Sequence, residues 1–557
     1  MDDFSVLIGG KAGFGIDKAG LIIARILNQL GYRIYIYRDY PSLIRGGHTF
    51  SVIRAAKEKI ASHRNKVDFL LALDQDTVDL HKDKLKEGTV VIYDSDTVKS
   101  DGIGIPIDKI IKEEKASEVM RNTCIIGAFC KSVGIVRQIL EDALKKNIGK
   151  EMDLNLKVAF KAYDSAQEKY RIEKLGQESL PVITGNEAIG LGLINGGLKT
   201  YIAYPMTPSS PILHFLAGVA KKFSLKVIHP ESEISVMLMA LGFACAGEKV
   251  AVGTSGGGFC LMTEGFSFAG MAELPAVVVL GQRPGPSTGL PTYSSQTELN
   301  FALSAGQGEF ARFVVAPGDP EEAYYWSGAA LNIAWKYQTP VIILSDKNMG
   351  EGVYSFDMRT VPAFKEELPL LWDAKQPYKR YLETPTGISP LAFAPQKNNV
   401  IKINSYEHDE MGITTEDPEL TVKMQDKRLR KEKYLAEELK EYKTVNVYGD
   451  TGSSVSVICW GSNKGVCTEA AQKLGLKVIQ PVVLWPFPEE ELRKSLKGTK
   501  KIICVESNAT AQLAMLLQRY GLKTDHHVLK YDGRPFALEG LEDQLRKCLS
   551  QKQEVTR

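Results

Sequence analysis

The sequence predicts an α/β protein of several domains, and two observations carry this prediction. Short apolar runs rich in β-branched residues recur at 225–229, 249–253 and 276–281, each bounded by Gly or Pro. Such runs are typical of buried parallel strands. The chain has 557 residues, and at roughly 150 residues per domain this length suggests three or four domains. We therefore expect three α/β domains and one less regular segment.

Composition excludes several classes of protein. Apolar residues make up 44% and charged residues 24%, and 69 basic against 67 acidic residues leave a net charge of +2. This balance offers no field that would attract nucleic acid or an anionic membrane. No apolar run approaches the ~20 residues that span a bilayer, and the opening MDDFSVLIGG is not a signal peptide. We expect a cytoplasmic protein that binds neither nucleic acid nor membrane.

Residues 1–175 are predicted to form the first domain. A strand leads into the glycine-rich turn GGKAGFGIDKAG at 9–20, then a helical pattern and a second strand. Backbone amides at such a helix start are able to face an anion. The spacing departs from GxGxxG, although Asp39 lies roughly where a ribose ligand stands, so a dinucleotide site is not favoured. The glycines either approach a phosphate or let helix and strand pack closely.

Residues 176–360 are predicted to form the second domain. Its strands end in four motifs: YPMTPSS at 204–210, HPESEISVMLMALGFACAG at 229–247, GTSGGGFCLMTEG at 253–265 and GQRPGPSTGLPT at 281–292. A parallel sheet gathers its strand-ending loops at one edge. We therefore expect these motifs to line a common crevice.

Residues 361–447 are predicted to be an irregular connecting segment. An acidic stretch at 405–419 precedes a basic helical run, which we interpret as a solvated helix with ion pairs four residues apart. His408 and Asp409, in EHDEMG, have an alternative interpretation near a substrate, because an imidazole beside carboxylates can titrate near neutrality. Residues 448–557 alternate strand and helix and are predicted to form the last domain.

The strings YPMTP and QRPGPSTGLPT, in this order, resemble the 2-oxoacid:ferredoxin oxidoreductases. The likeness is to the α subunit with a γ domain fused at its N-terminus, and above all to the 2-oxoglutarate enzyme. It implies a γ domain, a pyrimidine-binding thiamine diphosphate domain and a transketolase C-terminal-like domain. Glu506, Asn508 and Gln512 in the last domain are interpreted as structural.

The resemblance implies a glutamate that activates thiamine diphosphate by a hydrogen bond to its pyrimidine ring. PESE offers Glu231 and Glu233. Ser232 is a plausible N-cap, which places Glu233 in the first turn of a helix whose dipole favours its ionised form. By motif match Glu233 is the activating residue. Glu231 is the alternative, and a glutamate that only caps the helix is a further possibility for either.

Other site residues follow from the same motifs. Thr207 and Arg283 are expected to bind the carboxylate of a 2-oxoacid, since a guanidinium grips a carboxylate with two parallel bonds. A local turn bond for Thr207 and a loop salt bridge for Arg283 are the alternatives. The glycine turn at 253–258 is expected beside the cofactor without gripping its diphosphate. The residues expected to contact the cofactor are Glu233, Pro205, Thr254 and Ser255.

In the γ domain the resemblance implies a contact with coenzyme A. Gly10, Gly13 and Gly15 are expected near a phosphate of the coenzyme. Arg45 is a further expected contact, and with His48 it is placed at a domain contact.

Some parts of such an enzyme are missing from this chain. The motif GDG with a later Asn, which holds diphosphate and Mg²⁺, is not completed at 318–320 or 449–451. No two cysteines are spaced as CxxC, and most lie in apolar strings as small hydrophobic side chains. An enzyme that reduces ferredoxin needs a cluster. The eight cysteines are Cys124, Cys130, Cys245, Cys260, Cys459, Cys467, Cys504 and Cys548.

We therefore expect a β subunit that carries Mg²⁺, the diphosphate site and a [4Fe-4S] cluster, in an αβ unit that pairs as (αβ)2. The implied reaction is oxidative decarboxylation of a 2-oxoacid, with coenzyme A taking the acyl group and ferredoxin the electrons. 2-Oxoglutarate is the expected substrate, with pyruvate and branched-chain 2-oxoacids as alternatives. A non-catalytic assembly subunit is the alternative of another class.

Overall fold

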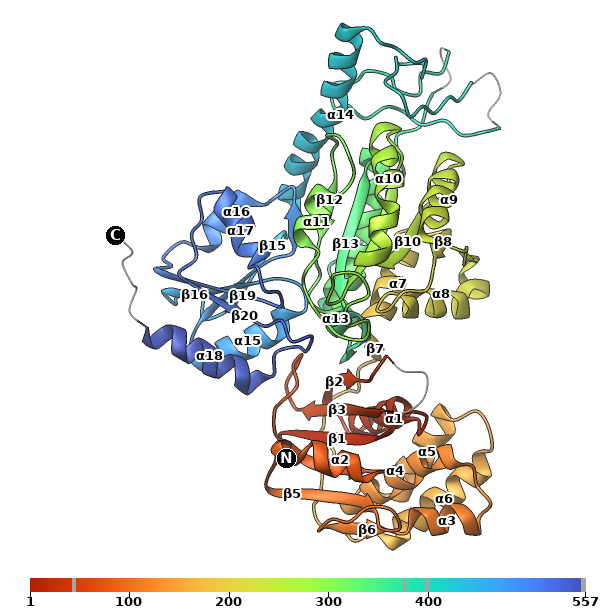
Figure 1. The fold of residues 1–557 in the computed structure, drawn as a ribbon, viewed down its shortest axis with the longest axis vertical. Helices are drawn as coiled ribbons and strands as arrows, with labels where there is room; N and C mark the ends of the chain where they lie inside the picture. The colour runs from red at the N-terminus through yellow and green to blue at the C-terminus, as the bar shows by residue number, and fades with distance from the viewer. Residues whose placement is uncertain (43–46, 374–376, 396–399, 552–557) are drawn as a thin grey trace. The chain divides into compact units, whose positions relative to one another are not determined.

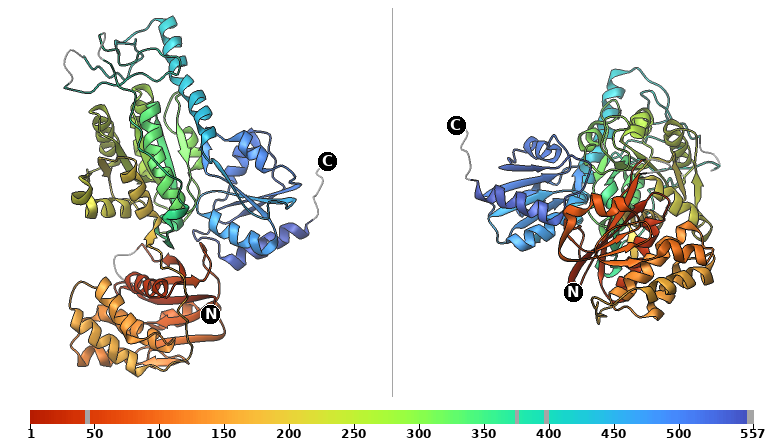
Figure 2. Two further views of the ribbon diagram at one scale, coloured as in Figure 1. Left: turned by 180° about the vertical axis from the view of Figure 1, so that it is seen from behind. Right: turned by 60° about the horizontal axis from the view of Figure 1, so that its bottom comes forward.

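The computed structural model describes residues 1–42, 47–373, 377–395 and 400–551, which fold into two compact units. Figures 1 and 2 colour them along the chain, with the N-terminal unit in red and orange. Strands and helices alternate in both units, which confirms the predicted α/β class. The first unit comprises Met1–Ile183, Gly352–Asp357 and Phe536–Asp543, and the second comprises Thr184–Glu351, Met358–Pro535 and Gln544–Arg557.

The first unit is built on a mixed sheet with the strand order β6-β5-β4-β1-β3-β2-β14-β7. The predicted strand, turn, helix and strand at the N-terminus are β1, α1 and β2. Strand β3 pairs antiparallel with both β1 and β2 and so separates them. The strands are β1 (Asp3–Lys11), β2 (Arg33–Asp39), β3 (His48–Ala56), β4 (Val67–Ala72), β5 (Leu85–Asp94), β6 (Ile103–Ile105), β7 (Val182–Thr184) and β14 (Val353–Ser355).

Alternation along β1 divides the core of this unit into two layers, since successive side chains point to opposite faces. Phe4, Val6 and Ile8 pack with the helices of one face, whereas Leu7 packs with Tyr35 on the other. The helices are α1 (Ile16–Gln29), α2 (Gln75–Leu80), α3 (Ile107–Glu113), α4 (Arg121–Ser132), α5 (Arg137–Asn147) and α6 (Met152–Ser165), with short 3-10 turns at Lys82–Lys84 and Glu118–Met120.

Two segments distant in sequence complete the first unit. β14 pairs antiparallel with β2, with Val353 opposite Ile36. Glu539 accepts hydrogen bonds from Arg64 Nε at 2.8 Å and from the backbone N–H of Asn65 at 2.9 Å. The sequence predicts both segments in other domains, because backbone pairing between distant segments leaves no local pattern. The division into four segments stays a prediction.

The second unit contains a seven-stranded and a five-stranded sheet among its described residues, with the orders β18-β12-β13-β11-β10-β8-β9 and β15-β17-β16-β19-β20. Among the described residues of the larger sheet, every strand pairing is parallel except that of β18 with β12. Its strands are β8 (Thr200–Ala203), β9 (Lys226–Ile228), β10 (Val250–Ser255), β11 (Ala276–Gln282), β12 (Phe313–Val315), β13 (Pro340–Asp346) and β18 (Val483–Trp485).

The runs predicted as buried parallel strands are thus β9, β10 and β11, and this prediction is confirmed. In the smaller sheet β15 alone pairs antiparallel, with β17, among the described residues. Its strands are β15 (Val445–Gly449), β16 (Val455–Cys459), β17 (Lys477–Pro481), β19 (Lys501–Glu506) and β20 (His526–Leu529).

Helices connect these strands. The predicted helix at the start of the second domain is α7, whose N-cap Thr184 and Glu187 form a reciprocal capping box. The helices are α7 (Gly185–Asn195), α8 (Ser210–Phe223), α9 (Glu233–Cys245), α10 (Gly256–Met271), α11 (Leu299–Ser304), α12 (Pro320–Tyr337), α13 (Lys347–Glu351), α14 (Pro418–Glu438), α15 (Asn463–Leu474), α16 (Glu489–Ser495) and α17 (Gln512–Arg519), with 3-10 turns at Met358–Thr360 and Leu439–Glu441. The last helix, α18 (Leu538–Ser550), belongs to the first unit up to Asp543 and to the second unit from Gln544.

The irregular segment was predicted in part correctly. Between 361 and 417 the described residues form no helix or strand, but α14 follows as a 21-residue helix (Figure 1). The interpretation of α14 as a solvated helix holds for most of its residues but not for its buried side, which consists of Met424, Lys427, Arg428, Lys431 and Leu435. Lys427 and Lys431 are buried and both contact the buried carboxylate of Glu273, with Lys427 Nζ 2.7 and 2.8 Å from its two oxygens. Tertiary ion pairs therefore replace the predicted local ones.

Three cations surround this one carboxylate. Arg380 donates from Nη2 to the backbone oxygen of Glu273 at 2.7 Å. Burial alone raises the pKa of Glu273, but the charges of Lys427, Lys431 and Arg380 outweigh it and lower that pKa. Burial and repulsion from the other cations lower the pKa of Lys431 to about 7. The cluster of Glu273, Lys427, Lys431 and Arg380 joins the end of α10 to α14.

Candidate functional site

Parallel pairing brings the strand-ending motifs of the larger sheet to one edge. Gly253 of β10 is paired with Ala203 of β8, and Ser255 of β10 with Gly281 of β11. The loops that follow β8, β10 and β11 therefore begin side by side. A Cβ at Gly281 would lie 3.0 Å from Pro208 Cγ, so the loops after β8 and β11 are in contact. The motifs that follow β8, β10 and β11 therefore lie together at one edge of the sheet, as predicted.

Glu233 is the first residue of α9. Its neighbour Ser232 is the N-cap, with its Oγ accepting from the backbone N–H of Ser235 at 3.4 Å, as the sequence predicts. The Glu233 side chain is 4% exposed, and its Oε1 is buried without a hydrogen-bond partner. A buried carboxylate oxygen in that state is costly unless a ligand supplies a donor.

The glycines after β10 make room for this carboxylate. A Cβ at Gly258 would lie 2.5 Å from Glu233 Oε1 and 2.1 Å from Thr254 Oγ1. The first turn of α10 therefore packs directly against Glu233, and only glycine fits there. Thr254 and Ser255 are fully buried, and Ser255 Oγ has no hydrogen-bond partner. The structure thus brings together Glu233, Thr254 and Ser255, while Pro205 lies exposed on the loop after β8.

Glu231, the alternative to Glu233, is an exposed residue. Its Oε1 accepts from Ser235 Oγ at 2.7 Å, and this bond lowers its pKa. The Glu231 carboxylate is thus exposed to water and bonded to the first turn of α9, as expected of a residue that only caps the helix. Of the two carboxylates, Glu233 is therefore the buried one, and its activating role stays a prediction.

Arg283 and Thr207 are joined by a hydrogen bond. Arg283 Nη1 donates to the backbone oxygen of Thr207 at 2.9 Å. Burial lowers the pKa of Arg283, and Glu298 opposes this effect. The bond leaves the Thr207 hydroxyl free of Arg283, and both residues are half-buried. The two residues that motif match assigns to the substrate are thus adjacent.

A cavity of about 500 Å³ opens beside Arg283. Its wall is formed by the start of α10, the loop after β11 and the segment around Glu298. Thr207 does not line it, although the adjacent Met206 does. The lining residues are Met206, Gly256, Gly257, Cys260, Arg283, Gly285, Pro286, Ser287, Thr288, Thr297, Glu298 and Phe301.

Sequence reasoning missed Glu298 and the buried Gln296 behind it. Gln296 Nε2 donates to the backbone oxygen of Trp460 at 2.7 Å, and its Oε1 accepts from Asn463 Nδ2 at 2.7 Å. Asn508 Nδ2 donates to the backbone oxygen of Gln296 at 3.1 Å. The string QTE after GLPT was the available signal, but no local periodicity points to it. The segment around Glu298, which forms one wall of the cavity, is thus held in place by Trp460, Asn463 and Asn508 of the C-terminal part of the chain.

The structural interpretation of three C-terminal residues agrees with their contacts. Glu506 is fully buried and accepts from the backbone N–H groups of Leu513 and Ala514 at the start of α17. Gln512 Nε2 donates to the backbone oxygen of Thr297 at 2.9 Å. These side chains, with Asn508, support the segment that carries Glu298.

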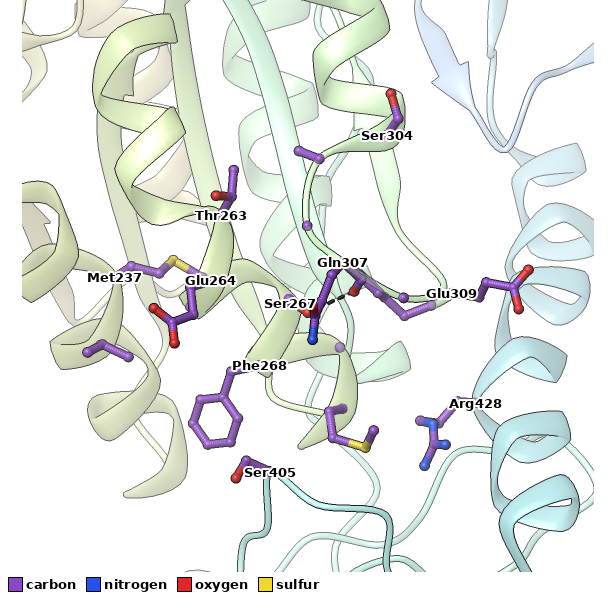
Figure 3. A pocket seen from close by; sticks show the side chains of 18 of the residues that line it. Met237, Thr263, Glu264, Ser267, Phe268, Ser304, Gln307, Glu309, Ser405 and Arg428 are labelled. Atoms are coloured by element: carbon purple, nitrogen blue, oxygen red, sulfur yellow. Dashed lines mark hydrogen bonds between the residues drawn. The ribbon is translucent and has the colours of Figure 1, made fainter. Parts of the chain in front are cut away.

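A larger groove of about 1110 Å³ runs along the outer faces of α9 and α10 (Figure 3). Glu264, Ser267 and Gln307 lie along it, and Ser267 Oγ donates to the backbone oxygen of Gln307 at 2.8 Å. Arg428 reaches it from α14 but is paired with Glu407. None of the residues predicted for the site lines this groove.

His408 and Asp409 have local structural roles. His408 is fully buried, its ring lies 3.8 Å from that of Tyr381, and its Nδ1 is 2.7 Å from the backbone oxygen of Tyr406. Burial lowers its pKa. Asp409 accepts from the backbone N–H groups of Met411 and Ile413. Neither lines either cavity, so the interpretation near a substrate has no support.

The glycines of the first unit differ in their surroundings. Gly13 and Gly15 have φ of +102° and +71°, in the region that favours glycine. A Cβ at Gly15 would lie 2.5 Å from Asn122 Nδ2, and one at Gly10 3.1 Å from Ile16 Cδ1, whereas Gly13 faces open space. Close packing thus accounts for Gly10 and Gly15 but not for Gly13. Arg45 lies outside the described residues.

His48 lies at the start of β3. Its Nε2 is 2.9 Å from Nε2 of His81 within the first unit. Burial lowers the pKa of both imidazoles, that of His81 to about 4.

Among the described residues no three His, Cys, Asp or Glu side chains are grouped to hold an ion. Six of the eight cysteines are buried, and Cys260 alone is exposed. No helix in the described ranges is long and apolar enough to cross a bilayer.

Two protein-family models match the chain. "Pyruvate ferredoxin/flavodoxin oxidoreductase" matches residues 5–165, and "Pyruvate flavodoxin/ferredoxin oxidoreductase, thiamine diP-bdg" matches residues 191–427. The second match covers the crevice edge with Glu233 and Arg283. Fold and site thus define an α/β oxidoreductase with a thiamine diphosphate-binding domain.

Relatives narrow this class. The 2-oxoacid:ferredoxin oxidoreductase subunit alpha of Saccharolobus solfataricus is 32% identical over 99% of this chain and 98% of its own length. The 2-oxoglutarate synthase subunit KorA of Archaeoglobus fulgidus is 30% identical over 59% of this chain and 88% of its own. The chain belongs to the 2-oxoacid:ferredoxin oxidoreductase family, as an α subunit, which confirms the predicted family and enzyme class.

A solved structure agrees with this assignment over the full chain. The 2-oxoglutarate:ferredoxin oxidoreductase from Magnetococcus marinus, with 2-oxoglutarate, coenzyme A and succinyl-CoA bound, matches with a TM-score of 0.90 and 30% identity. The match covers 98% of this chain and 99% of that one.

Proposed function

We propose that this chain is the α subunit, with a fused γ domain, of a 2-oxoglutarate:ferredoxin oxidoreductase. The reaction is the reversible conversion of 2-oxoglutarate and coenzyme A to succinyl-CoA and CO₂, with reduction of ferredoxin. The observation that carries the proposal is the buried, unpartnered carboxylate oxygen of Glu233 at the crevice edge that Arg283 shares. The substrates named for the Magnetococcus marinus enzyme support the choice of 2-oxoglutarate.

The residues fit the pyrimidine end of thiamine diphosphate. When bound, this cofactor supplies the nucleophilic carbon that adds to a 2-oxo group. Glu233 Oε1, which no donor among the described residues reaches, would accept a hydrogen bond from a ring nitrogen of the cofactor, and a charge-assisted bond of this kind is about twice as strong as a neutral one. Pro205, Thr254 and Ser255 lie on the loops beside it. Glu233 would thereby hold the pyrimidine ring in place and assist the proton transfer that activates the cofactor.

Arg283 and Thr207 bind the substrate. Arg283 is half-buried at the cavity, where its Nη1 donates to the backbone oxygen of Thr207. A guanidinium has five N–H donors, so Arg283 is able to bind a carboxylate as well. The Thr207 hydroxyl adds a neutral donor. A guanidinium shielded from bulk water both orients and neutralises an anion, so this pair fixes the reacting carbon beside the cofactor.

The rest of the active site lies on a partner. We infer a β subunit that holds Mg²⁺, the cofactor diphosphate and a [4Fe-4S] cluster, because this chain completes no GDG motif and its cysteines are dispersed. The name "subunit alpha" of the relatives supports a partner. Ferredoxin is the electron acceptor, the assembly is (αβ)2, and the location is the cytoplasm. In the γ domain Gly13, with Gly10 and Gly15, approaches a coenzyme A phosphate.

The proposal is tested by purifying the chain with its partner subunit and assaying 2-oxoacids with coenzyme A and a viologen dye. We expect 2-oxoglutarate to give the highest kcat/KM, above pyruvate and a branched-chain 2-oxoacid. Preference for either alternative would overturn the substrate but keep the family chemistry. A non-catalytic assembly subunit predicts that Glu233, Thr207 and Arg283 can all be replaced without kinetic effect.

A further inference from the structure

The cavity beside Arg283 holds a second charged side chain, Glu298, that the proposed function does not yet use. Arg283 and Glu298 are the two charged residues of its lining, all of which lies in described parts of the chain. Glu298 is 9% exposed. The Glu298 carboxyl group is thus shielded from bulk water but lines a cavity, so it is able to contact a ligand bound there.

Contacts from three sides fix this carboxyl group. The backbone N–H of Glu298 donates to Gln282 Oε1 at 3.1 Å, and Thr297 Oγ1 donates to Glu298 Oε2 at 3.0 Å. A Cβ at Gly256 would lie 2.6 Å from Glu298 Oε1. The carboxyl group therefore sits between the end of β11 and the start of α10, with one oxygen bound by Thr297.

The two charged groups do not neutralise each other by contact. No ion pair joins Arg283 to Glu298, both of which are described, and Arg283 Nη1 donates to Thr207 instead. Burial raises the pKa of Glu298 to about 7, against the bonds from Thr297 and the charge of Arg283. The remaining titratable group of the cavity lining is the exposed thiol of Cys260. Glu298 is therefore able to keep its proton near neutral pH, and a protonated carboxyl group is a hydrogen-bond donor.

We propose that Glu298 is a further binding residue for the 2-oxoacid, which in its protonated form donates a hydrogen bond to a substrate oxygen. The proposal rests on the proposed function. With Glu298 neutral, the cavity carries the single positive charge of Arg283 and accepts an anion. With Glu298 ionised, the two charges cancel and a substrate carboxylate meets a buried like charge. Binding of the 2-oxoacid therefore requires the proton on Glu298, more strongly for a dicarboxylate than for pyruvate.

The test compares three forms of the complex with its partner subunit: wild type, Glu298→Gln and Glu298→Ala. The amide keeps a donor and cannot ionise, whereas Ala removes the group. KM for the 2-oxoacid is measured from pH 6.5 to 9. In the wild type we expect KM to rise above pH 7, approaching tenfold per pH unit. In Glu298→Gln KM should stay close to the low-pH wild-type value throughout, and in Glu298→Ala it should be roughly tenfold higher and flat.

Glu264→Gln is the matched control, because Glu264 is exposed on α10 and does not line this cavity. Its profile should follow the wild type. A Glu298→Gln profile that keeps the wild-type rise, or Gln and Ala forms with equal KM, would overturn the inference. If Glu298→Ala does not fold, the slopes of the wild type and the near-isosteric Gln form decide alone. A wild-type complex that turns over no 2-oxoacid overturns the proposed function as well, so the two failures are distinct.

Discussion

Glu233 shows how a single residue is prepared by its surroundings. Ser232 caps the helix that Glu233 begins, and Gly258 leaves room for its carboxylate. No donor in the described ranges of the chain reaches Oε1. A buried acceptor without a donor costs free energy in the folded chain, and the proposed cofactor bond would recover it. The unpartnered Oε1 of Glu233 is therefore consistent with its proposed role as a hydrogen-bond acceptor for the cofactor.

Replacement of Glu233 by Gln should abolish most turnover. The amide keeps the size of the side chain but cannot hold the proton, and positioned proton transfer contributes roughly 10²–10⁴-fold to rates. We expect kcat for the 2-oxoacid to fall in that range, measured by dye reduction. Glu231→Gln is the control, because Glu231 is exposed two residues away. Wild-type turnover in Glu233→Gln would move the activating role elsewhere.

Replacement of Arg283 by Ala should weaken substrate binding selectively. Loss of one partner of a buried charge pair typically costs about 3–5 kcal/mol, so KM for the 2-oxoacid should rise roughly 10²- to 10³-fold. Thiamine diphosphate affinity, followed by calorimetry, should not change. Arg519→Ala, at an exposed position of α17, is the control. An unchanged KM in Arg283→Ala contradicts the assignment.

The third prediction at this scale concerns Gly13. Its open surroundings admit a side chain, so Gly13→Asp adds a charge without a clash, at the backbone strain of a positive φ. We expect KM for coenzyme A to rise about tenfold through repulsion of a phosphate. Gly13→Asn carries the same strain without the charge and serves as control. Equal KM values for the Asp and Asn forms would falsify the phosphate contact.

Among the elements, α14 departs furthest from its sequence pattern. A helix rich in Lys and Arg is usually solvated, but here two of its lysines converge on Glu273 at the end of α10. The buried carboxylate of Glu273 thus holds the polar helix α14 against the end of α10. Arg428, on the same helix, makes a bidentate pair with Glu407 of the irregular segment.

Glu273→Gln should therefore destabilise the second unit. The change leaves Lys427, Lys431 and Arg380 without a countercharge in a buried site, and removal of one partner of a buried pair costs about 3–5 kcal/mol. We expect the unfolding midpoint in guanidinium chloride to fall clearly below that of the wild type. Glu416→Gln, exposed just before α14, should leave the midpoint unchanged. An unaffected midpoint in Glu273→Gln would show that the cluster is replaceable.

At the scale of the whole molecule, we propose that this chain contributes only part of the active site. It contains the buried carboxylate of Glu233 and the cavity beside Arg283, while its described residues group no metal ligands. We expect the isolated chain to bind thiamine diphosphate and Mg²⁺ at least roughly 100-fold more weakly than the complex, about 2.7 kcal/mol. Calorimetry on both forms measures this difference. Tight binding of cofactor and metal by the isolated chain would contradict the proposed division of the site.

Local patterns were sufficient for much of the fold and part of the site. β-Branched runs predicted β9, β10 and β11 as parallel strands, because burial on both faces demands continuous apolar sequence. A Ser before a helical pattern predicted the cap and hence the placement of Glu233 in the first turn of α9. Long motif strings led to the family. The roles of Glu233, Thr207 and Arg283 remain proposals.

Tertiary structure alone decided the rest. It placed β14 and residues 536–543 in the first unit, turned Lys427 and Lys431 inward to Glu273, and set Glu298 beside Arg283. The physical reason is common to all three. Strand pairing, burial of charge and the walls of a cavity depend on segments that meet only after folding, whereas a sequence records directly only interactions between neighbours along the chain.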